Sequence, residues 1–185
     1  MKAVSHFQLG IFLAENYMHD SPRRYTRAFI LGCVEPDKNP ATYFKGSLRN
    51  AWLRGHNWDS ANRYIQKICR RLERKEQLHL FDYYNLGKLI HYTADAFTYT
   101  HNRCFRDGLR AHRRYEKGLH TYFSLYLSTT PCPDGLHSGT AADTIHSYHS
   151  DYMARSAGVH TDAEYTVTVC TAVLCKLLQR FVQSV

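Results

Sequence analysis

Hydrophobic residues recur every three or four positions along most of this chain, the spacing that places them on one face of an α-helix. Near the beginning, this spacing predicts a helix over about residues 3–18 whose apolar face consists of Val4, Phe7, Ile11, Ala14 and Met18. The same pattern predicts helices over about residues 58–72, 78–99 and 107–127.

Turn residues set the limits of a further helix early in the chain. Pro22, preceded by Asp20 and Ser21, is typical of a helix start, and we expect this helix to continue to about Cys33. Residues 34–41 contain two prolines, an aspartate and an asparagine, and therefore predict a loop.

Two capping patterns predict the last two helices. Thr140 with Asp143, and Thr161 with Glu164, have the spacing of a capping box. We expect a loop over residues 128–139 before the first of these helices and Gly158 to end it. The final helix is expected to bury one apolar series: Val167, Cys170, Leu174, Leu177 and Phe181.

These elements predict an all-α protein, a compact bundle of about seven helices in a single domain over residues 1–185. The hydrophobic fraction of 44% excludes a disordered chain. No apolar run reaches the roughly 20 residues of a membrane span, and no signal-peptide pattern is evident. We expect a cytoplasmic protein; the alternative is a secreted one whose targeting segment lies outside the printed sequence.

Composition adds two chemical hints. The chain has 12 histidines, and neutral imidazole is the commonest metal ligand in proteins. The formal net charge is +8, which suits an anionic partner. The six cysteines include no Cys-x-x-Cys pair, so we expect them to be reduced and mostly buried rather than metal-binding.

Histidine–carboxylate pairs occur on two consecutive predicted helices. His91 and Asp95 are four residues apart, as are His112 and Glu116, and residues at that spacing lie on the same helix face. His101 falls between the two pairs, just beyond the expected helix end. Each pair alone is weak evidence, but the ordered set predicts a polynuclear metal site enclosed by the bundle.

Upstream residues extend this set into a family pattern. In order, the chain contains His6, then Gly32-Cys-Val-Glu-Pro-Asp37, then Gly55-His56, and then the histidine–carboxylate pairs. This order resembles the zinc-dependent phospholipase C family, whose helical fold is shared with the S1/P1 nucleases. The resemblance covers about residues 3–120, and the last third of the chain carries no matching motif.

The resemblance implies two to three zinc ions. It implies that Asp37, His56, His91 and Asp95 hold the first ion and that His101, His112 and Glu116 hold the second. Asp95 would bridge to a third ion, which His6 also binds. Secreted members of the family complete that third site with an N-terminal Trp; this chain departs from them, since it begins Met1-Lys2-Ala3.

The expected chemistry is phosphodiester hydrolysis by a metal-activated water molecule, with Asp37 as the catalytic residue that holds or deprotonates this water. The leading hypothesis is a phospholipase C-type hydrolase that acts on phospholipid. The alternatives are an S1/P1-type nuclease and a non-catalytic zinc-binding domain. Expected partners are therefore a phospholipid or other phosphodiester, anionic surfaces contacted peripherally, and nucleic acid as the runner-up substrate.

Six basic residues between Arg103 and Lys117 interleave with the second predicted ligand set and could attract an anionic substrate. Other histidines receive less specific interpretations. For His146, His149 and His160, surface or capping roles are expected. His19-Asp20 is the dipeptide of another class of helical metal phosphohydrolases, but a lone dipeptide is weak evidence.

Overall fold

The computed structural model describes residues 1–39, 58–133 and 139–182. Within these ranges the secondary structure is entirely helical, which confirms the predicted all-α class. The helices are α1 (Ala3–Tyr17), α2 (Arg23–Lys38), α4 (Trp58–Glu73), α5 (Leu80–Ala96), the 3-10 helix η1 (Tyr99–His101), α6 (Leu109–Thr129), α7 (Ala141–Met153) and α8 (Val159–Val182).

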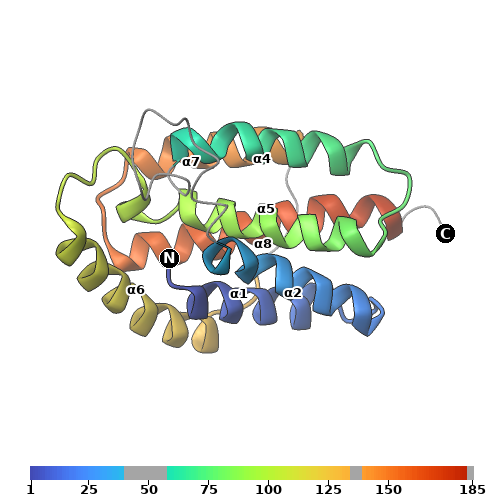
Figure 1. Cartoon of the computed structure of the whole chain (residues 1–185), viewed down its shortest axis with the longest axis horizontal. Coiled ribbons are helices and arrows are strands. Elements are labelled where there is room, and N and C mark those ends of the chain that lie inside the picture. Colours follow the sequence, from blue (N-terminus) through green and yellow to red (C-terminus); the bar gives the residue numbers. More distant parts are fainter. Residues whose placement is uncertain (40–57, 134–138, 183–185) are drawn as a thin grey trace.

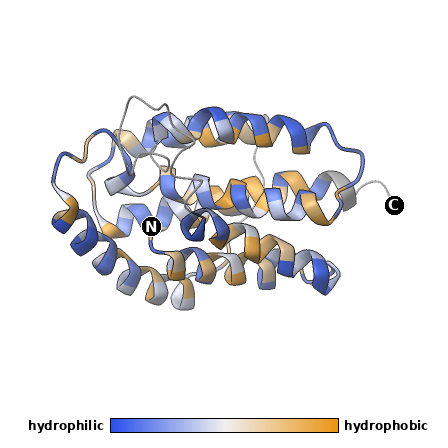
Figure 2. Cartoon of the chain, in the orientation of Figure 1, coloured by the Kyte–Doolittle hydropathy of each residue, from blue (hydrophilic) through white to orange (hydrophobic). Residues whose placement is uncertain are grey.

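Helix α5 is the centre of the bundle. It contacts α2, α4, α8 and α1, and Figure 1 shows it running through the middle of the molecule. Every residue from 85 to 98 is buried, as expected for a helix surrounded by others. Figure 2 shows hydrophobic residues along α5 and mainly hydrophilic ones along the outer side of α4. The polar residues His91 and Asp95 are therefore held inside the protein.

Two glycines allow α2 and α5 to cross at very close range. A Cβ atom on Gly32 would lie 2.1 Å from the carbonyl oxygen of Tyr84, and one on Gly87 would lie 2.0 Å from that of Phe29. No side chain fits at either position. The close crossing brings the end of α2, with Cys33 and Asp37, against the middle of α5.

Helix α2 is longer than its sequence indicated. The predicted loop over residues 34–41 is wrong for residues 34–38, which belong to the helix even though Pro36 lies inside it. Packing outweighs the proline: Glu35 pairs with Lys88 of α5 at 3.0 Å. Asn39 closes the helix by donating from its backbone N–H to the Glu35 carbonyl. Asp37 is thus on a helix and not in a loop.

The predicted apolar face of helix α1 is buried only at its C-terminal end, where Ala14 and Met18 lie in the core. Val4 and Phe7 are 54% and 46% exposed, while Ser5, His6 and Leu9 are buried. The helix carries apolar residues on most sides, so periodicity offered more than one face. The face that turns inward contains His6, and this rotation delivers the histidine to the interior.

The last two helices agree with the sequence in their cores and differ at one boundary. The Thr140–Asp143 capping box is present, as predicted. However, α7 ends at Met153 and α8 begins at Val159, so Gly158 precedes α8 and does not end α7, and Thr161 lies inside α8. The carbonyl of Gly158 accepts the backbone N–H of Asp162, which starts α8 earlier than the second capping pattern predicted. The predicted core positions with described side chains are all buried: Val167, Cys170, Leu174 and Leu177.

All six cysteines are unpaired thiols, and four of them, Cys33, Cys69, Cys170 and Cys175, are buried. The prediction of reduced, mostly buried cysteines is therefore confirmed.

Candidate metal centre

The C-terminal end of α5 is where the predicted ligands meet. His91 and Asp95 come from α5, His6 from α1, Asp37 from the end of α2, His101 from η1, and His112 and Glu116 from α6. The predicted ligand His56 lies outside the described residues. The other predicted ligands, which are far apart in the sequence, form two adjacent groups.

The first group consists of His6, His91 and Asp95, whose ligand atoms all lie within 4.8 Å of one another. The Asp95 carboxylate is 3.2 Å from Nε2 of His6 and 3.4 Å from Nε2 of His91. Charge-assisted hydrogen bonds are usually shorter, about 2.7–2.9 Å. Bonds of about 2.0–2.2 Å to a tetrahedral zinc ion place neighbouring ligand atoms about 3.3–3.5 Å apart. The observed spacing therefore suits ligands around one zinc ion.

A hydrogen bond to the backbone of α2 fixes the orientation of the His91 ring. Its Nδ1 atom lies 2.9 Å from the carbonyl oxygen of Cys33, which can only accept, so Nδ1–H must donate. The Nε2 atom then faces the carboxylates of Asp95 and Asp37, an arrangement that suits a cation held between them. A metal-binding histidine is usually held this way, with its second nitrogen donating to a backbone carbonyl.

His6 is also in its ligand form. Burial, followed by repulsion from the His91 ring, lowers the pKa of His6 to about 4, so the ring is neutral at pH 7. Zinc requires the neutral imidazole. The first group thus fits zinc in its geometry, and His6 also fits in its protonation.

Asp37 completes this side of the cluster. Its carboxylate oxygens lie 3.8 Å from Nε2 of His91 and 3.9 Å from Nε2 of His6. Its side chain is 16% exposed, whereas that of Asp95 is 1% exposed. Asp37 is therefore the carboxylate of this group that reaches toward solvent.

The second group consists of His101, His112 and Glu116. The Glu116 Oε1 atom lies 3.3 Å from Nε2 of His101 and 3.2 Å from Nε2 of His112. Hydrogen bonds to these histidines outweigh the effect of burial and hold the pKa of Glu116 well below its usual range. The three side chains are partly exposed, so this group lies nearer the surface than the first.

Asp95 connects the two groups. One of its oxygens faces His6, and the other lies 3.4 Å from His91 and 3.7 Å from Nδ1 of His101. Burial acts to raise the pKa of Asp95, but positive charge from His101 and the Met1 amino group holds it well below its usual range. The carboxylate is therefore ionised and lies between both sets of nitrogen ligands.

The Met1 amino group also lies within the cluster, although this chain lacks the N-terminal Trp with which secreted members of the family complete the third site. Its nitrogen is 2.5 Å from Asp95, 3.0 Å from Nε2 of His101 and 3.3 Å from Glu116. Burial acts to lower the pKa of this amino group, but Asp95 and Glu116 raise it to about 10. The carboxylates therefore converge on a position that already accommodates a cation.

The comparison with protein families shows which family the chain belongs to. The family model described as zinc-dependent phospholipase C matches residues 5–163. The chain belongs to the zinc-dependent phospholipase C family. This is a hydrolase family whose name indicates zinc dependence, and the match extends beyond the range of about residues 3–120 over which the sequence resembled it. Searches of curated proteins and of solved structures found no match.

Several histidines of the described residues lie outside this cluster. His19 and Asp20 pair on the surface and are 69% and 93% exposed, and His160 is 70% exposed. His149, for which a surface or capping role was expected, is instead buried against Trp58. That expectation was wrong because helical periodicity does not reveal which polar residue turns inward.

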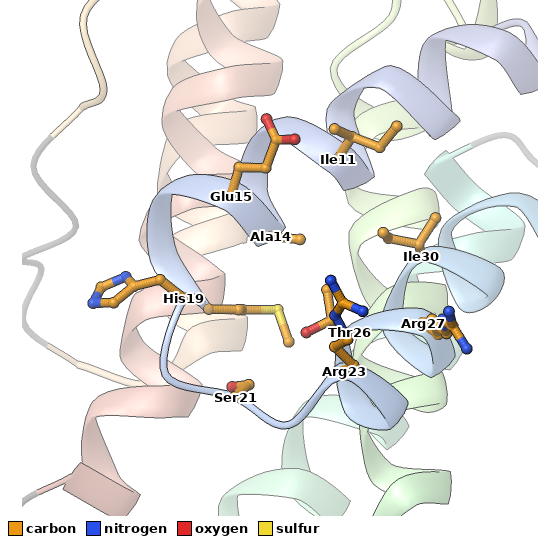
Figure 3. A pocket seen from close by; sticks show the side chains of 10 residues that line it. Ile11, Ala14, Glu15, His19, Ser21, Arg23, Thr26, Arg27 and Ile30 are labelled. Carbon is orange, nitrogen blue, oxygen red and sulfur yellow. The ribbon is translucent and has the colours of Figure 1, made fainter.

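A surface crevice lies away from this cluster. It runs between α1 and α2, where Ile11, Ala14 and Ile30 form an apolar floor with Arg23 and Arg27 beside it (Figure 3). None of the predicted ligands lines it. In the described part of the chain, no helix has the length and apolar character that crossing a membrane requires.

Proposed function

We propose that this protein is a zinc-dependent phosphodiesterase that hydrolyses phospholipids on the glycerol side of the phosphate, using two to three zinc ions. The observation that carries the proposal is the arrangement around Asp95, where two histidine groups with ligand-like spacing meet at one buried carboxylate. Family membership supports the chemistry, because the family is named for zinc-dependent phospholipase activity.

The ligands of the first ion would come from His91, Asp95, Asp37 and His56, and those of the second from His101, His112 and Glu116. In this scheme His6 and Asp95 hold the third ion. In the two-ion form of the proposal, His6, His91 and Asp95 would together hold one ion, which their spacing supports.

When bound, zinc ions offset the charge of a phosphodiester and lower the pKa of a water molecule toward neutrality. Asp37 would hold this water molecule and accept its proton. Its partial exposure and its position beside His6 and His91 support this role, since a general base must reach both solvent and substrate. Asp95, fully buried and ionised, would act as a fixed bridging ligand.

The basic residues of α6 and the loop before it would draw an anionic substrate toward the second group. Six are exposed: Arg103, Arg106, Arg110, Arg113, Arg114 and Lys117. Such a surface favours association with phosphate-bearing ligands and weakens as salt is added. It supports a lipid phosphodiester and equally the second candidate, a nuclease on the same scaffold.

The test is to measure phosphatidylcholine and single-stranded nucleic acid hydrolysis side by side, after zinc reconstitution. Release of diacylglycerol with little cleavage of nucleic acid is the expected result. The reverse preference would favour the nuclease, and activity on neither would favour a non-catalytic zinc-binding domain.

The proposed role of Asp37 is tested by substitution. Asp37→Asn should lower kcat at least 100-fold. Glu35→Gln, on the same helix but directed at Lys88, should retain kcat within about threefold.

A further inference from the structure

The loop that carries His101 is held by residues from the last part of the chain. We infer that Asp162 and His149 are positioning residues that fix His101 and Glu116 for binding of the second metal ion. This inference rests on the proposed function, because it assumes that His101, His112 and Glu116 hold a metal.

His101 is the predicted ligand with the weakest local support. It lies in a single 3-10 turn after the end of α5, and its backbone N–H donates to the Thr98 carbonyl. Short 3-10 segments have poorer hydrogen-bond geometry than α-helices. A ligand in such a segment needs contacts from other elements to keep one orientation, since metal affinity depends on ligand geometry.

Asp162 supplies the first of these contacts. This carboxylate is completely buried on α8 and accepts the backbone N–H of Tyr99 at 2.9 Å. It also accepts the hydroxyl of Tyr115 at 2.9 Å and that of Tyr152 at 2.8 Å. Tyr99 begins the turn that ends at His101, and Tyr115 directly precedes Glu116 on α6. One buried carboxylate thus joins the two segments that carry His101 and Glu116.

His149 supplies the second contact, from α7. Its Nε2 atom lies 2.9 Å from Oδ1 of Asn102, the residue after His101. The Asn102 amide nitrogen donates to the carbonyls of Ala96 and Thr98, so its oxygen must be the acceptor and His149 Nε2–H the donor. Trp58 stacks on the His149 ring with centroids 3.7 Å apart and holds it in place. The turn is therefore fixed on both sides of His101.

Both residues lie outside the two metal groups and touch neither His101 nor Glu116 in any described contact. They act through Tyr99, Tyr115 and Asn102, which lie one or two residues from a ligand in the sequence. A buried carboxylate with three donors from three elements is costly to assemble, and such networks fix one local structure when every group is satisfied. This gives the C-terminal helices a role in the metal site, although they contribute no predicted ligand.

Measuring the affinity for each zinc ion distinguishes a positioning role of Asp162 from a general effect on protein stability. For Asp162→Ala, competition with a chelator should show the second zinc ion bound at least tenfold more weakly and the first within about twofold. Asp162→Asn, which retains an acceptor, should recover part of the affinity. Val173→Ala, a core truncation on the same helix, should lower thermal stability without a selective effect on either ion. Unchanged affinities, or equal weakening of both ions, would overturn the inference.

A second readout uses the metal-free protein. Amide hydrogen exchange at Tyr99 and Asn102 should be at least tenfold faster in Asp162→Ala than in the wild type, and should stay near the wild-type rate in Val173→Ala. Tyr152→Phe and His149→Gln should give smaller increases, which keeps the test valid if Asp162→Ala fails to fold. Unchanged exchange would contradict the inference. If the wild-type protein binds no zinc, the proposed function is refuted. The exchange rates of Tyr99 and Asn102 then still test whether Asp162 and His149 hold the turn.

Discussion

The imidazole ring of His6 stacks on that of His91, with centroids 3.8 Å apart and planes 25° apart. Two imidazolium ions would repel each other at this distance, and the lowered pKa of His6 keeps at least that ring neutral at pH 7. Both Nε2 atoms point toward Asp95. The pair is therefore arranged with two ring nitrogens that face one carboxylate.

Replacing Asp95 should remove zinc. Asp95→Asn substitutes a neutral amide for the carboxylate that lies between both histidine groups, so we expect the loss of at least one zinc ion per chain. Metal analysis after reconstitution and gel filtration measures this. The matched control is Asp82→Asn, a buried carboxylate at the other end of the same helix that caps α5 with His79. Equal zinc content in the two variants would contradict the bridging role of Asp95.

The second group should lose its ion independently. His112→Gln removes one nitrogen donor to the position beside Glu116 and leaves His6, His91 and Asp95 in place. We expect the zinc content to fall by about one ion per chain. His160→Gln alters an exposed histidine outside the cluster and should leave the content unchanged. Complete loss of zinc in His112→Gln would show that the two groups do not bind separately.

The helix crossing beneath the site should tolerate no added methyl group. Gly87→Ala places a Cβ atom against the backbone of α2 and should lower the free energy of unfolding by about 3 kcal/mol. At Gly118, in the middle of α6, an added Cβ atom meets no neighbouring atom. Gly118→Ala should therefore raise the free energy of unfolding by about 0.5–1 kcal/mol. Urea unfolding of both variants measures the difference. A neutral Gly87→Ala would mean that α2 and α5 are farther apart than described.

His149 should make the protein sensitive to acid. Burial, followed by repulsion from His146, lowers the pKa of His149 to about 4, against an ordinary value of 6.5. The unfolded chain therefore binds more protons than the folded one between these pH values, and stability falls as pH decreases from 6.5 to 4. His149→Gln removes this contribution. The stability advantage of the wild type over the variant, measured by urea unfolding, should shrink on acidification; a constant difference would refute the shift.

Much of the fold follows from local patterns, because α4, α5 and α6 each carry a clear apolar period and α7 a capping box. Besides the boundary between α7 and α8, two features did not follow from these patterns. The sequence predicted that α2 would end near Cys33, yet packing against α5 and the Glu35–Lys88 pair carry the helix past Pro36. The buried face of α1 was misjudged because its apolar residues surround the helix, so only tertiary contacts decide which side turns inward.

In the candidate site, too, some residues could be predicted from the sequence and others could not. His91 with Asp95, and His112 with Glu116, could be found from sequence because spacing along one helix decides their proximity. The nearness of His6 to His91 depends on how α1 packs, and only the family resemblance suggested it. Asp162 and His149 gave no signal at all, because a buried polar residue is recognised by its partners and not by its spacing.

The central claim is that zinc binds at both histidine–carboxylate groups. The most direct test is a crystal structure of the zinc-reconstituted protein, with anomalous diffraction collected on both sides of the zinc absorption edge. We expect one zinc peak bounded by His91 and Asp95, a second bounded by His101, His112 and Glu116, and any third peak beside His6. The absence of zinc peaks from both groups, or peaks only at other residues, would contradict this claim.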